Sequence, residues 1–559
     1  MENKIEDKKL EKIEKWAFIG IVLIACLVMF FFMSKKEGWH CDEIFSYGSS
    51  NCYYENTLHP YGEKDSTRIF LETYIFTGGI KENINNFKYY MIDHNDEREK
   101  IMSELISHEV PTWRNREDAE NYVKAGDNRF NYISVYYNQL RDVHPPLFYM
   151  LVHTVSSIFN NTFSKYIIFF VSLPFFIGTC YFIRKILILL DRREIASIAV
   201  ALYGLTSGAI STMMFQRMYM MLTFFTVVCL YIHLIIRKRN YTTTHKLRFA
   251  LFGVTILGFL TQYYYCIYAA LIAAVMCIVF IKRKNYKEMF KYIRTLAISA
   301  IVGVLVFPSS IHHIFFSYRG VNSFGNSGYF ERLFDFIKYI FNSFGGTNII
   351  ITSLFAIVLV THLVTRKKDK DLIAMIGFPV LAYIIIIAKI APYIEIRYIM
   401  NVLPILSIIF VMGISGLFDN KAYNTLIAGV AVVFLIGCSF IFTKPSFLYK
   451  GYQDYIDISE KYRDDSVVYV GYTVFNHIQS IPEFMNYKQV LMLSKDKLDL
   501  TINDEVLESE NEFILIVNKY LGNEEVLETV MNNTGYSHYE VLKDDAATGV
   551  DNVVYRVYR

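Results

Sequence analysis

The sequence lacks the short motifs that mark several large classes of soluble enzyme. It contains no G-x-x-x-x-G-K-[ST], H-E-x-x-H or C-x-x-C pattern, so phosphate-loop, zinc-peptidase and dithiol chemistry receive no support. Lysine and arginine form no rich tail, and the formal net charge is only +3, which gives no indication of nucleic-acid binding. Internal repeats and low-complexity stretches are absent as well. The informative features of this chain are therefore its apolar runs and the polar residues between them.

Hydrophobic residues dominate the composition. They make up 53% of the 559 residues, aromatic residues make up 16%, and the mean hydropathy is +0.28. Such values are too high for a soluble enzyme of this size and predict a polytopic α-helical membrane protein. Most of the eight cysteines lie inside apolar runs, where a thiol acts as a small core residue.

The first apolar run, Trp16–Met33, carries no charge. It is long for the core of a secretory signal, and Ser34-Lys35-Lys36 follows it in place of an A-x-A-like cleavage site. At about 1.5 Å per residue it can nearly cross a hydrocarbon core of roughly 30 Å. We therefore interpret it as an uncleaved membrane anchor.

Further apolar stretches, with basic clusters between alternate pairs, predict about eleven transmembrane helices. The ten later stretches are centred on residues 165–183, 195–210, 218–236, 249–261, 264–281, 295–308, 347–364, 372–388, 398–417 and 422–442. Lysine and arginine concentrate in the short loops on one side, which places the N-terminus in the cytoplasm. Pro145–Phe159 is also apolar but short, and crossing would disturb this alternation. We expect an interfacial or re-entrant helix there, with a full crossing as the alternative.

This topology divides the chain into three parts. We expect a cytoplasmic N-terminus (1–15), a membrane domain (16–444) with a long first extracytoplasmic loop (34–144), and a small extracytoplasmic α/β domain (445–559). Short runs typical of strands support the last part, namely SVVYVGY, KQVLML, FILIVN and NVVYRVY, with a helical NEEVLETVMNN among them. The predicted location is the plasma membrane of a bacterium, as a multi-pass protein with its C-terminal domain outside.

The chemically suggestive residues gather at the outer ends of the predicted spans. Ionisable residues at membrane depth are costly and usually functional. The segments concerned are Asp42/Glu43, Arg141–Tyr149, Phe215–Met221, Thr261–Tyr265, Ser317–Gly320 and Tyr393–Pro404. Because six separate segments fall on one face, they predict a site there more strongly than any one motif does.

Each segment also has a purely structural interpretation. Asp42 and Glu43 are equally consistent with a solvated loop pair, and Asp142 with a helix start before two prolines. Arg217 and Arg397 are consistent with side chains that extend to the lipid headgroups. The tyrosines at 263–265 fit an aromatic belt at the membrane surface. These alternatives stay open at the level of single segments.

Two cysteines lie in the hydrophilic stretch after the first span. A disulfide between Cys41 and Cys52 would pin the loop that carries Asp42, provided that this loop lies outside the cell. No cluster of residues has the spacing of a dedicated metal site, so we assign no metal ligands, and a divalent cation stays an open question.

Taken together, the segments resemble the GT-C class of membrane glycosyltransferases, in particular the bacterial branch related to protein O-mannosyltransferases and lipid A aminoarabinose transferases. That family has an Asp-Glu pair in its first outer loop, which CDEIFSY matches, and a D-x-HPPL segment, which DVHPPL matches. QRMYMM and RYIMNVLP match two later segments of the family. The resemblance covers about residues 15–440 and indicates neither the sugar nor the acceptor.

The resemblance implies an inverting transfer of a hexose or pentose from a polyprenyl-phosphate donor to an acceptor hydroxyl at the outer membrane surface. A hydroxyl needs a general base, for which we propose Asp42, with Glu43 as its assistant. The phosphate leaving group needs a cation, and arginine pairs with phosphate through its planar fork. Candidates for this role are Arg217, Arg397 and Arg319. Supporting roles at the site fall to Asp142, His144, Tyr219, Tyr264 and Tyr398.

Two other function classes fit parts of the sequence. A transporter or flippase of a lipid-linked sugar would also be polytopic, but it should carry its polar residues near the bilayer midplane in broken helices. A sensor or assembly protein would use the external domain as its receptor, yet eleven spans exceed what an anchor needs. The expected partners are a polyprenyl-phosphate-linked sugar, an envelope glycan, lipid or protein acceptor, and the bilayer, without nucleic acid.

Overall fold

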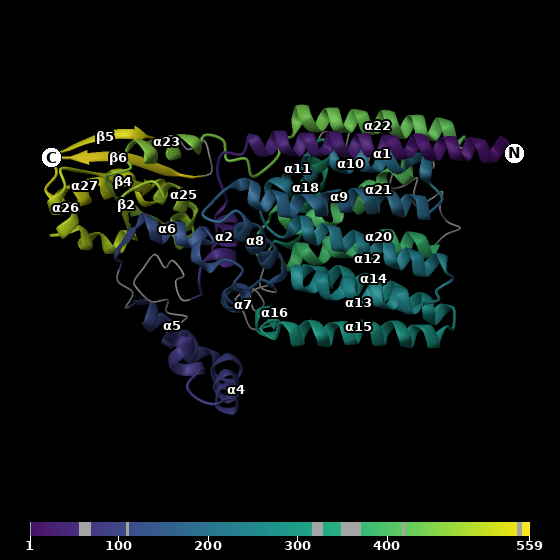
Figure 1. Cartoon of the computed structure of the whole chain (residues 1–559), viewed down its shortest axis with the longest axis horizontal. Helices are drawn as coiled ribbons and strands as arrows, with labels where there is room; N and C mark the ends of the chain where they lie inside the picture. The colour runs from purple at the N-terminus through teal and green to yellow at the C-terminus, as the bar shows by residue number, and fades with distance from the viewer. Residues whose placement is uncertain are drawn as a thin grey trace. The chain divides into compact units, whose positions relative to one another are not determined.

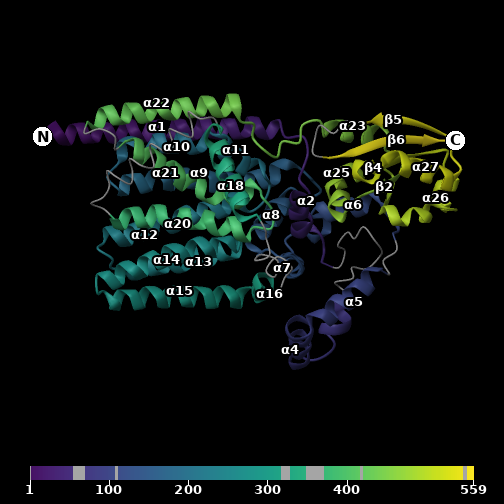
Figure 2. The same cartoon turned by 180° about the vertical axis from the view of Figure 1, so that it is seen from behind.

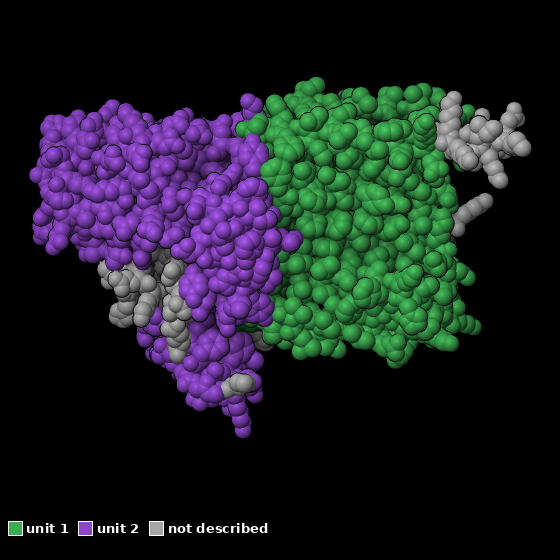
Figure 3. Space-filling model, viewed as in Figure 1, with its two compact units in different colours: residues 1–34, 143–148, 168–446 green, residues 35–142, 149–167, 447–559 purple. Residues whose placement is uncertain are grey.

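The computed structural model describes residues 2–54, 69–107, 111–315, 328–347, 370–415, 420–544 and 550–559. The chain divides into two compact units, coloured separately in Figure 3. Unit 1 contains residues 1–34, 143–148 and 168–446, and unit 2 contains residues 35–142, 149–167 and 447–559. The first loop thus shares a unit with the C-terminal segment, whereas the functional division into 1–15, 16–444 and 445–559 stays a prediction.

Unit 1 is a bundle of long helices, which run side by side in both views (Figures 1 and 2). The long helices are α1 (Glu2–Ser34), α9 (Lys165–Leu189, in unit 1 from Ile168), α12 (Tyr219–Lys238), α13 (His245–Thr261), α14 (Tyr264–Lys282), α15 (Tyr286–Val306), α20 (Lys370–Ile390) and α22 (Lys421–Phe442). They form because each apolar run satisfies all its backbone hydrogen bonds internally, which lipid demands. The polytopic helical architecture is therefore as the hydropathy indicated.

Seven helices within the described ranges are long and apolar enough to cross a membrane. They are the part of α1 from Leu10, α9, α12, α14, α15, α20 from Asp371, and α22. The expected stretch 249–261 lies in α13, which has 17 residues, and most of the expected stretch 347–364 falls outside the described residues. The count of eleven crossings accordingly stays a prediction.

One expected span was wrong in form. The stretch 195–210 is not a straight helix, because α10 (Ala196–Gly204) and α11 (Ser207–Met214) meet at an angle of 54°. The break falls at Leu205 and Thr206. The expected span 398–417 is likewise composite. It begins as two 3₁₀ turns, η5 (Ile396–Tyr398) and η6 (Met400–Val402), and continues as α21 (Leu403–Ile414).

The remaining helical pieces of unit 1 are short. They are η4 (Arg193–Ile195), α16 (Ser310–Phe315) and α18 (Tyr329–Phe344). The apolar segment near residue 150 becomes α8 (Leu147–Ile158), whose 12 residues extend about 18 Å. Since that is well under the thickness of a hydrocarbon core, α8 fits an interfacial or re-entrant helix better than a crossing one.

A buried ion pair fastens α1 to α9 inside unit 1. The guanidinium of Arg184 donates to both carboxylate oxygens of Glu14, with its Nε at 2.8 Å and 3.1 Å and its terminal nitrogen at 2.6 Å. Such two-pronged, charge-assisted bonds are among the strongest that side chains make. The first long helix is thereby held in register against the second, α9.

Unit 2 contains an open α/β sheet with helices around it. Its helical elements are α2 (Cys41–Asn51), η1 (Leu71–Ile75), α4 (Ile80–Lys88), η2 (Tyr89–Asp93), α5 (Asn95–Ser107), α6 (Arg116–Val123), η3 (Gly126–Asn128), α7 (Tyr132–Arg141), the larger part of α8, α23 (Gln453–Lys461), α24 (Val474–Gln479), α25 (Ile481–Phe484), η7 (Lys495–Thr501), α26 (Glu505–Ser509), η8 (Lys519–Leu521) and α27 (Asn523–Thr534). Its strands are β1 (Trp113–Asn115), β2 (Ser466–Val470), β3 (Gln489–Leu493), β4 (Glu512–Asn518), β5 (His538–Lys543) and β6 (Asn552–Tyr558).

The sheet has the strand order β1-β3-β2-β4-β6-β5. Its middle is parallel, because β2 pairs in parallel with both β3 and β4, and the outer strands are antiparallel. The four runs that the sequence suggested as strands are β2, β3, β4 and β6, and the expected helix is α27, so the prediction of a small α/β sheet is confirmed. Strand β5, with its exposed and polar residues, gave no such signal.

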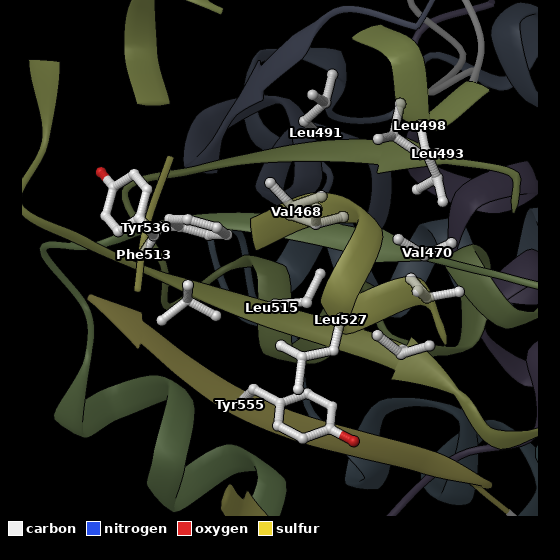
Figure 4. Close-up of a cluster of buried hydrophobic side chains, with 14 of the residues drawn as sticks. Val468, Val470, Leu491, Leu493, Leu498, Phe513, Leu515, Leu527, Tyr536 and Tyr555 are labelled. Carbon is white, nitrogen blue, oxygen red and sulfur yellow. The ribbon is translucent and has the colours of Figure 1, made fainter. Parts of the chain in front are cut away.

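The core of unit 2 lies between this sheet and α27. Figure 4 shows side chains of the central strands and of α27 packed together, among them Val468, Leu515 and Leu527. The strands contribute nearly continuous apolar runs, as is usual when a parallel sheet is covered on both faces. Sequence and sheet therefore agree on where the hydrophobic core sits.

The first loop completes the sheet. Strand β1, from the loop, pairs with the edge of β3, and the indole of Trp113 donates to Asp504 at 3.0 Å. The guanidinium of Arg116 donates to the carbonyl oxygens of Arg463, Asn486 and Tyr487. These pairs are between 347 and 391 positions apart in the chain. The loop and the C-terminal segment consequently fold as one body.

Two titratable side chains are buried in the short helices that follow β2. Burial raises the pKa of Glu483 in α25 to about 7, and burial lowers the pKa of His477 in α24 to about 4. Glu483 favours the folded state at low pH, and its contribution is lost as the pH rises from about 4.5 through 7. His477 acts in the opposite sense, because its neutral form is the buried one. Its contribution is complete above about 6.5 and is lost as the pH falls towards 4.

We expect Glu483→Gln to stabilise the protein more at pH 8 than at pH 5. At pH 8 the wild-type Glu483 side chain is ionised in the unfolded state, and its burial in the folded state costs free energy whether it ionises or stays protonated. The difference between a pKa of 4.5 and one of about 7 corresponds to about 3 kcal/mol. Thermal unfolding at both pH values measures this difference. Glu528→Gln, which removes an exposed carboxylate of α27, serves as the control and should show no such pH dependence. An equal gain at both pH values would contradict the assignment.

Candidate active site

In unit 2 the Asp42-Glu43 pair opens helix α2. His40 is the N-cap residue, and its Nδ1 accepts the backbone N–H of Asp42 at 3.1 Å. In return, the carboxylate of Glu43 accepts the backbone N–H of His40 at 2.8 Å, which completes a capping box. Both carboxylates stand in the first turn, where the helix dipole favours negative charge. The helix start therefore holds the pair in a defined orientation.

The two neighbouring carboxylates have different environments. Glu43 is fully buried, and both its oxygens accept from the ammonium of Lys36, at 3.0 and 3.1 Å. Asp42 keeps 15% of its side chain exposed, and its nearest Oδ lies 3.8 Å from Nδ1 of His40. Burial lowers the pKa of Lys36, and the Glu43 carboxylate offsets only part of this effect. Asp42 is thus the more accessible of the two carboxylates, and Glu43 helps to hold the start of the helix.

The suggested disulfide between Cys41 and Cys52 is wrong. Cys41 is the first residue of α2 and Cys52 is the residue just past its end. Eleven helical residues at 1.5 Å each separate them by about 16 Å, whereas the Cα atoms of a disulfide lie within about 7 Å. No disulfide joins them. The loop is held by helix capping and the Lys36 ion pair instead.

A potential metal-binding group lies at the same helix start. The ligand atoms of His40, Cys41 and Asp42 lie within 4.8 Å of one another. These are the residue types that zinc prefers. However, Nδ1 of His40 already serves as the acceptor of the helix cap, so a cation bound through that nitrogen would have to displace the cap. We therefore assign no step to a metal.

In unit 1, Arg397 lies in the 3₁₀ turn η5 between α20 and α21. Its guanidinium donates to Glu395 at 2.9 Å and stands over the rings of Tyr398 (5.2 Å), Phe215 (5.9 Å) and Tyr393 (5.9 Å). Only 7% of its side chain is exposed. Within unit 1 the guanidinium is thus surrounded by aromatic rings. Each cation–π interaction of this kind stabilises the positive charge by about 0.5–2 kcal/mol. This differs from a surface side chain that reaches for headgroups.

The segment that carries Arg397 is held from α18. The guanidinium of Arg332 donates to the carbonyl oxygens of Ala388, at 2.8 Å, and of Ala391. The hydroxyl of Tyr339 donates to the carbonyl of Ile394 at 3.3 Å. These bonds satisfy carbonyls at the C-terminal end of α20, which have no partner in the helix itself. The non-helical segment before Arg397 is therefore stabilised by hydrogen bonds from α18.

Arg217 lies in the short break between α11 and α12. It is buried, and its guanidinium lies 3.4 Å from Nε2 of His144. Since arginine only donates, Nε2 of His144 is the acceptor and its proton is on Nδ1. The DVHPPL and QRMYMM segments, 73 positions apart, thus meet in unit 1. His144, to which the sequence assigned a supporting role, therefore contacts Arg217.

The three candidate tyrosines belong to the same aromatic cluster. Tyr219 stacks on Phe215 with ring centres 5.6 Å apart, and Tyr264 meets Tyr398 edge to face at 5.4 Å. Tyr383 donates to the carbonyl of Tyr398 at 3.0 Å, which fixes that residue from α20. The backbone N–H of Arg217 donates to the carbonyl of Phe215 at 2.7 Å, and this bond links the Arg217–His144 pair to the aromatic residues around Arg397.

Other candidates fall elsewhere. Asp142 is half-buried and is the C-cap residue of α7. It belongs to unit 2, as does the helix start that carries Asp42. Arg319 lies outside the described residues. Sequence reasoning missed Lys36 and the rings of Phe215 and Tyr393. A lysine directly after an apolar run and before an acidic pair, and aromatic residues within four positions of an arginine, were the available signals.

Comparisons with known proteins give one structural similarity to report. No family model matches the chain, and a search of the curated proteins finds no match. Among solved structures, the chain is similar to ArnT from Cupriavidus metallidurans bound to undecaprenyl phosphate. The TM-score is 0.48 and the sequence identity 11%, over 96% of this chain and 97% of that one.

This neighbour is of the branch that the sequence motifs resemble. With these values the similarity describes the overall path of the chain. The function proposed below rests instead on the residues of the two units.

We expect Arg397→Lys to lower the rate of sugar transfer at least tenfold with the protein level unchanged. Lysine keeps the charge but lacks the planar fork that pairs with two phosphate oxygens and stacks on rings. The matched control is Arg283→Lys, because Arg283 also pairs with a carboxylate (Asp371, 3.1 Å) and stands over a tyrosine (Tyr241, 4.3 Å), but is 44% exposed. Near-normal transfer by the Arg397 variant would assign that arginine a structural role.

Proposed function

We propose that the protein is a membrane glycosyltransferase that moves a sugar from a polyprenyl-phosphate donor to an acceptor hydroxyl. The observation that carries this proposal is the division of roles between two adjacent carboxylates. Glu43 is buried and neutralised by Lys36, while Asp42 stays accessible on the same helix turn, eight residues after the first long apolar helix ends. The 15% of the Asp42 side chain that stays exposed leaves it within reach of an acceptor hydroxyl in this proposal.

The chemistry follows from what such a transfer needs. A donor with a polyprenyl chain stays in the bilayer, so its phosphate lies at headgroup depth. The acceptor hydroxyl forms a bond to the anomeric carbon as its proton passes to the Asp42 carboxylate. The bond from that carbon to the phosphate oxygen breaks, and the polyprenyl phosphate leaves with the electron pair. Attack from the side opposite the phosphate inverts the anomeric carbon.

The arginines of unit 1 supply the positive charge in this proposal. Arg217 and Arg397 both stand in breaks between helices, where a side chain at the end of an apolar segment can face polar groups. Charged residues in membrane helices face protein or polar cavities and mark binding paths. Arg217 and Arg397 would hold the donor phosphate, with Arg319 as the third candidate, and His144 would orient Arg217. The sugar and the acceptor are left open by this chemistry.

One observation favours the alternative of a lipid-linked sugar transporter. The broken pair α10 and α11, bent by 54°, is a feature that transporters use at their substrate sites. The break, at Leu205 and Thr206, contains no charged residue. Reconstituted protein with a radiolabelled polyprenyl-phosphate sugar separates the two, because a transferase produces a labelled acceptor and a transporter only moves the label across the bilayer.

We expect Asp42→Asn to abolish transfer while the protein still inserts and binds donor lipid. A general base typically contributes about 10²–10⁴-fold to the rate. Glu43→Gln should also be damaging, because it leaves the buried Lys36 charge unmatched, but less so, since glutamine still accepts from the His40 backbone. Asp464→Asn, at a carboxylate of unit 2 that is 96% exposed, is the control. An Asn variant that kept a tenth of wild-type kcat would rule out Asp42 as the base.

We further expect the C-terminal segment to lie outside the cell. Ser466 is unsuitable as a reporter because it is buried in β2, so we choose Asp464→Cys. It should react with a membrane-impermeant thiol reagent in intact cells, with the parent protein as the blank. Arg239→Cys, exposed between α12 and α13, should react only after lysis. The reverse pattern would overturn the topology and with it the outer-face site.

A further inference from the structure

Two segments of unit 2 that are far apart in the sequence are joined directly before helix α2. The ammonium of Lys36 donates to the carbonyl of Phe447 at 2.6 Å, and the backbone N–H of Glu37 donates to the carbonyl of Leu448 at 2.9 Å. The backbone N–H of Gly451 donates to the carboxylate of Glu37. Residues 36–37 and 447–451, which follow the first and the last long apolar helices, thus form one junction.

The junction imposes strain on its C-terminal side. Phe447 and Tyr449 have φ angles of 67° and 48°, in the left-handed region that side chains other than glycine disfavour. Two such residues within three positions persist only when the surroundings determine the conformation. The ammonium of Lys36 also lies 5.1 Å from the Tyr449 ring. Both strained residues therefore contact this lysine, Phe447 through its carbonyl and Tyr449 through its ring.

Lys36 connects this segment with the proposed catalytic helix. Its three donors reach both oxygens of Glu43 and the Phe447 carbonyl, and the Lys36 and Glu43 side chains are completely buried. Glu43 is the third residue of α2 and accepts the capping N–H of His40. The position of the Asp42 turn is thereby coupled to the backbone at Phe447, which lies 411 positions from Lys36.

The residues next to this ion pair pack tightly against the C-terminal segment. A Cβ on Gly38 would lie 2.6 Å from the ring of Tyr452 and 2.9 Å from Cβ of Tyr449. Gln479, at the end of α24, donates to the carbonyl of Trp39 at 3.0 Å, and Phe475 meets Phe45 of α2. The approach to α2 is thus enclosed by the C-terminal segment from two directions.

We propose that Lys36 is a positioning residue for Asp42, through which the C-terminal segment becomes a working part of the transferase. This inference rests on the proposed role of Asp42 as the base. An ion pair that served stability alone would need only Lys36 and Glu43, but here the same ammonium also holds a strained backbone from the C-terminal segment. A displacement of about 1 Å at a catalytic group can lower a rate about 100-fold.

The experiment compares Lys36→Met with Lys495→Met in the full-length protein. Lys495 is the matched control, because its ammonium also bridges a carboxylate (Glu525, 2.7 Å) and a carbonyl (Leu521, 3.0 Å), yet it is 40% exposed. We expect Lys36→Met to lower kcat at least tenfold, with the KM for the polyprenyl-phosphate donor unchanged. Amide hydrogen exchange should become faster in α2 and stay unchanged in the sheet. Lys495→Met should alter neither.

Two further variants keep the test decisive if Lys36→Met folds poorly. Lys36→Met with Glu43→Gln leaves no unpaired buried charge but still cannot hold the Phe447 carbonyl, so α2 should stay mobile and kcat low. Gly38→Ala leaves the ion pair intact and pushes on Tyr452, and it should lower kcat as well. Gly79→Ala, with no atom within 4 Å of the new Cβ, is its control.

The outcomes separate this inference from the proposed function. Unchanged amide hydrogen exchange in α2 of the Lys36 variants would overturn the positioning role, whatever their activity. Faster exchange with an unchanged kcat would show that α2 is tethered but that Asp42 does not depend on the tether, which also overturns it. A wild-type protein without transferase activity would refute the proposed function, whereas the exchange data would still report on the tether.

Discussion

The arrangement around helix α2 depends on one fully buried ion pair, Lys36–Glu43. Two charges without contact with water are costly unless every polar atom finds a partner. Here the ammonium has two carboxylate oxygens and a carbonyl, and the carboxylate also accepts the capping N–H of His40. Loss of either partner would leave a buried charge unmatched. The loop start, the helix start and the C-terminal segment are therefore stable only together.

Unit 1 meets the same physical demand in a different way. Its long helices satisfy their own backbone, and the two candidate arginines lie in places where helices break. Arg217 stands between α11 and α12, Arg397 stands between α20 and α21, and Arg332 donates to the carbonyls at the end of α20. Breaks leave backbone groups and side chains that need polar partners. This requirement brings histidine, arginine and tyrosine together at the breaks in unit 1.

The sheet of unit 2 shows how far local patterns reach. Strands β2, β3, β4 and β6 were visible as apolar runs, because a covered sheet requires apolar residues on both faces. Strand β1 has three residues with no apolar run, and it exists only because β3 offers an edge to it. Its helix partner α6 is held by Arg116 through carbonyls of the C-terminal segment. A short edge strand of this kind has no local signal.

The sequence by itself determined the apolar helices, the α/β character of the C-terminal part and the residue types of the candidate site. These features depend on local composition. A helix satisfies its own backbone hydrogen bonds, and a buried strand needs a run of apolar residues. Only the tertiary structure decided that Glu43 is buried while Asp42 is open, that His144 contacts Arg217, that 195–210 is bent, and that Cys41 and Cys52 are held apart by a helix. Each of these depends on a partner distant in the chain or on the exact course of the backbone. Lys36 is the extreme case, because the carbonyl that it holds lies 411 positions away, beyond the reach of any local pattern.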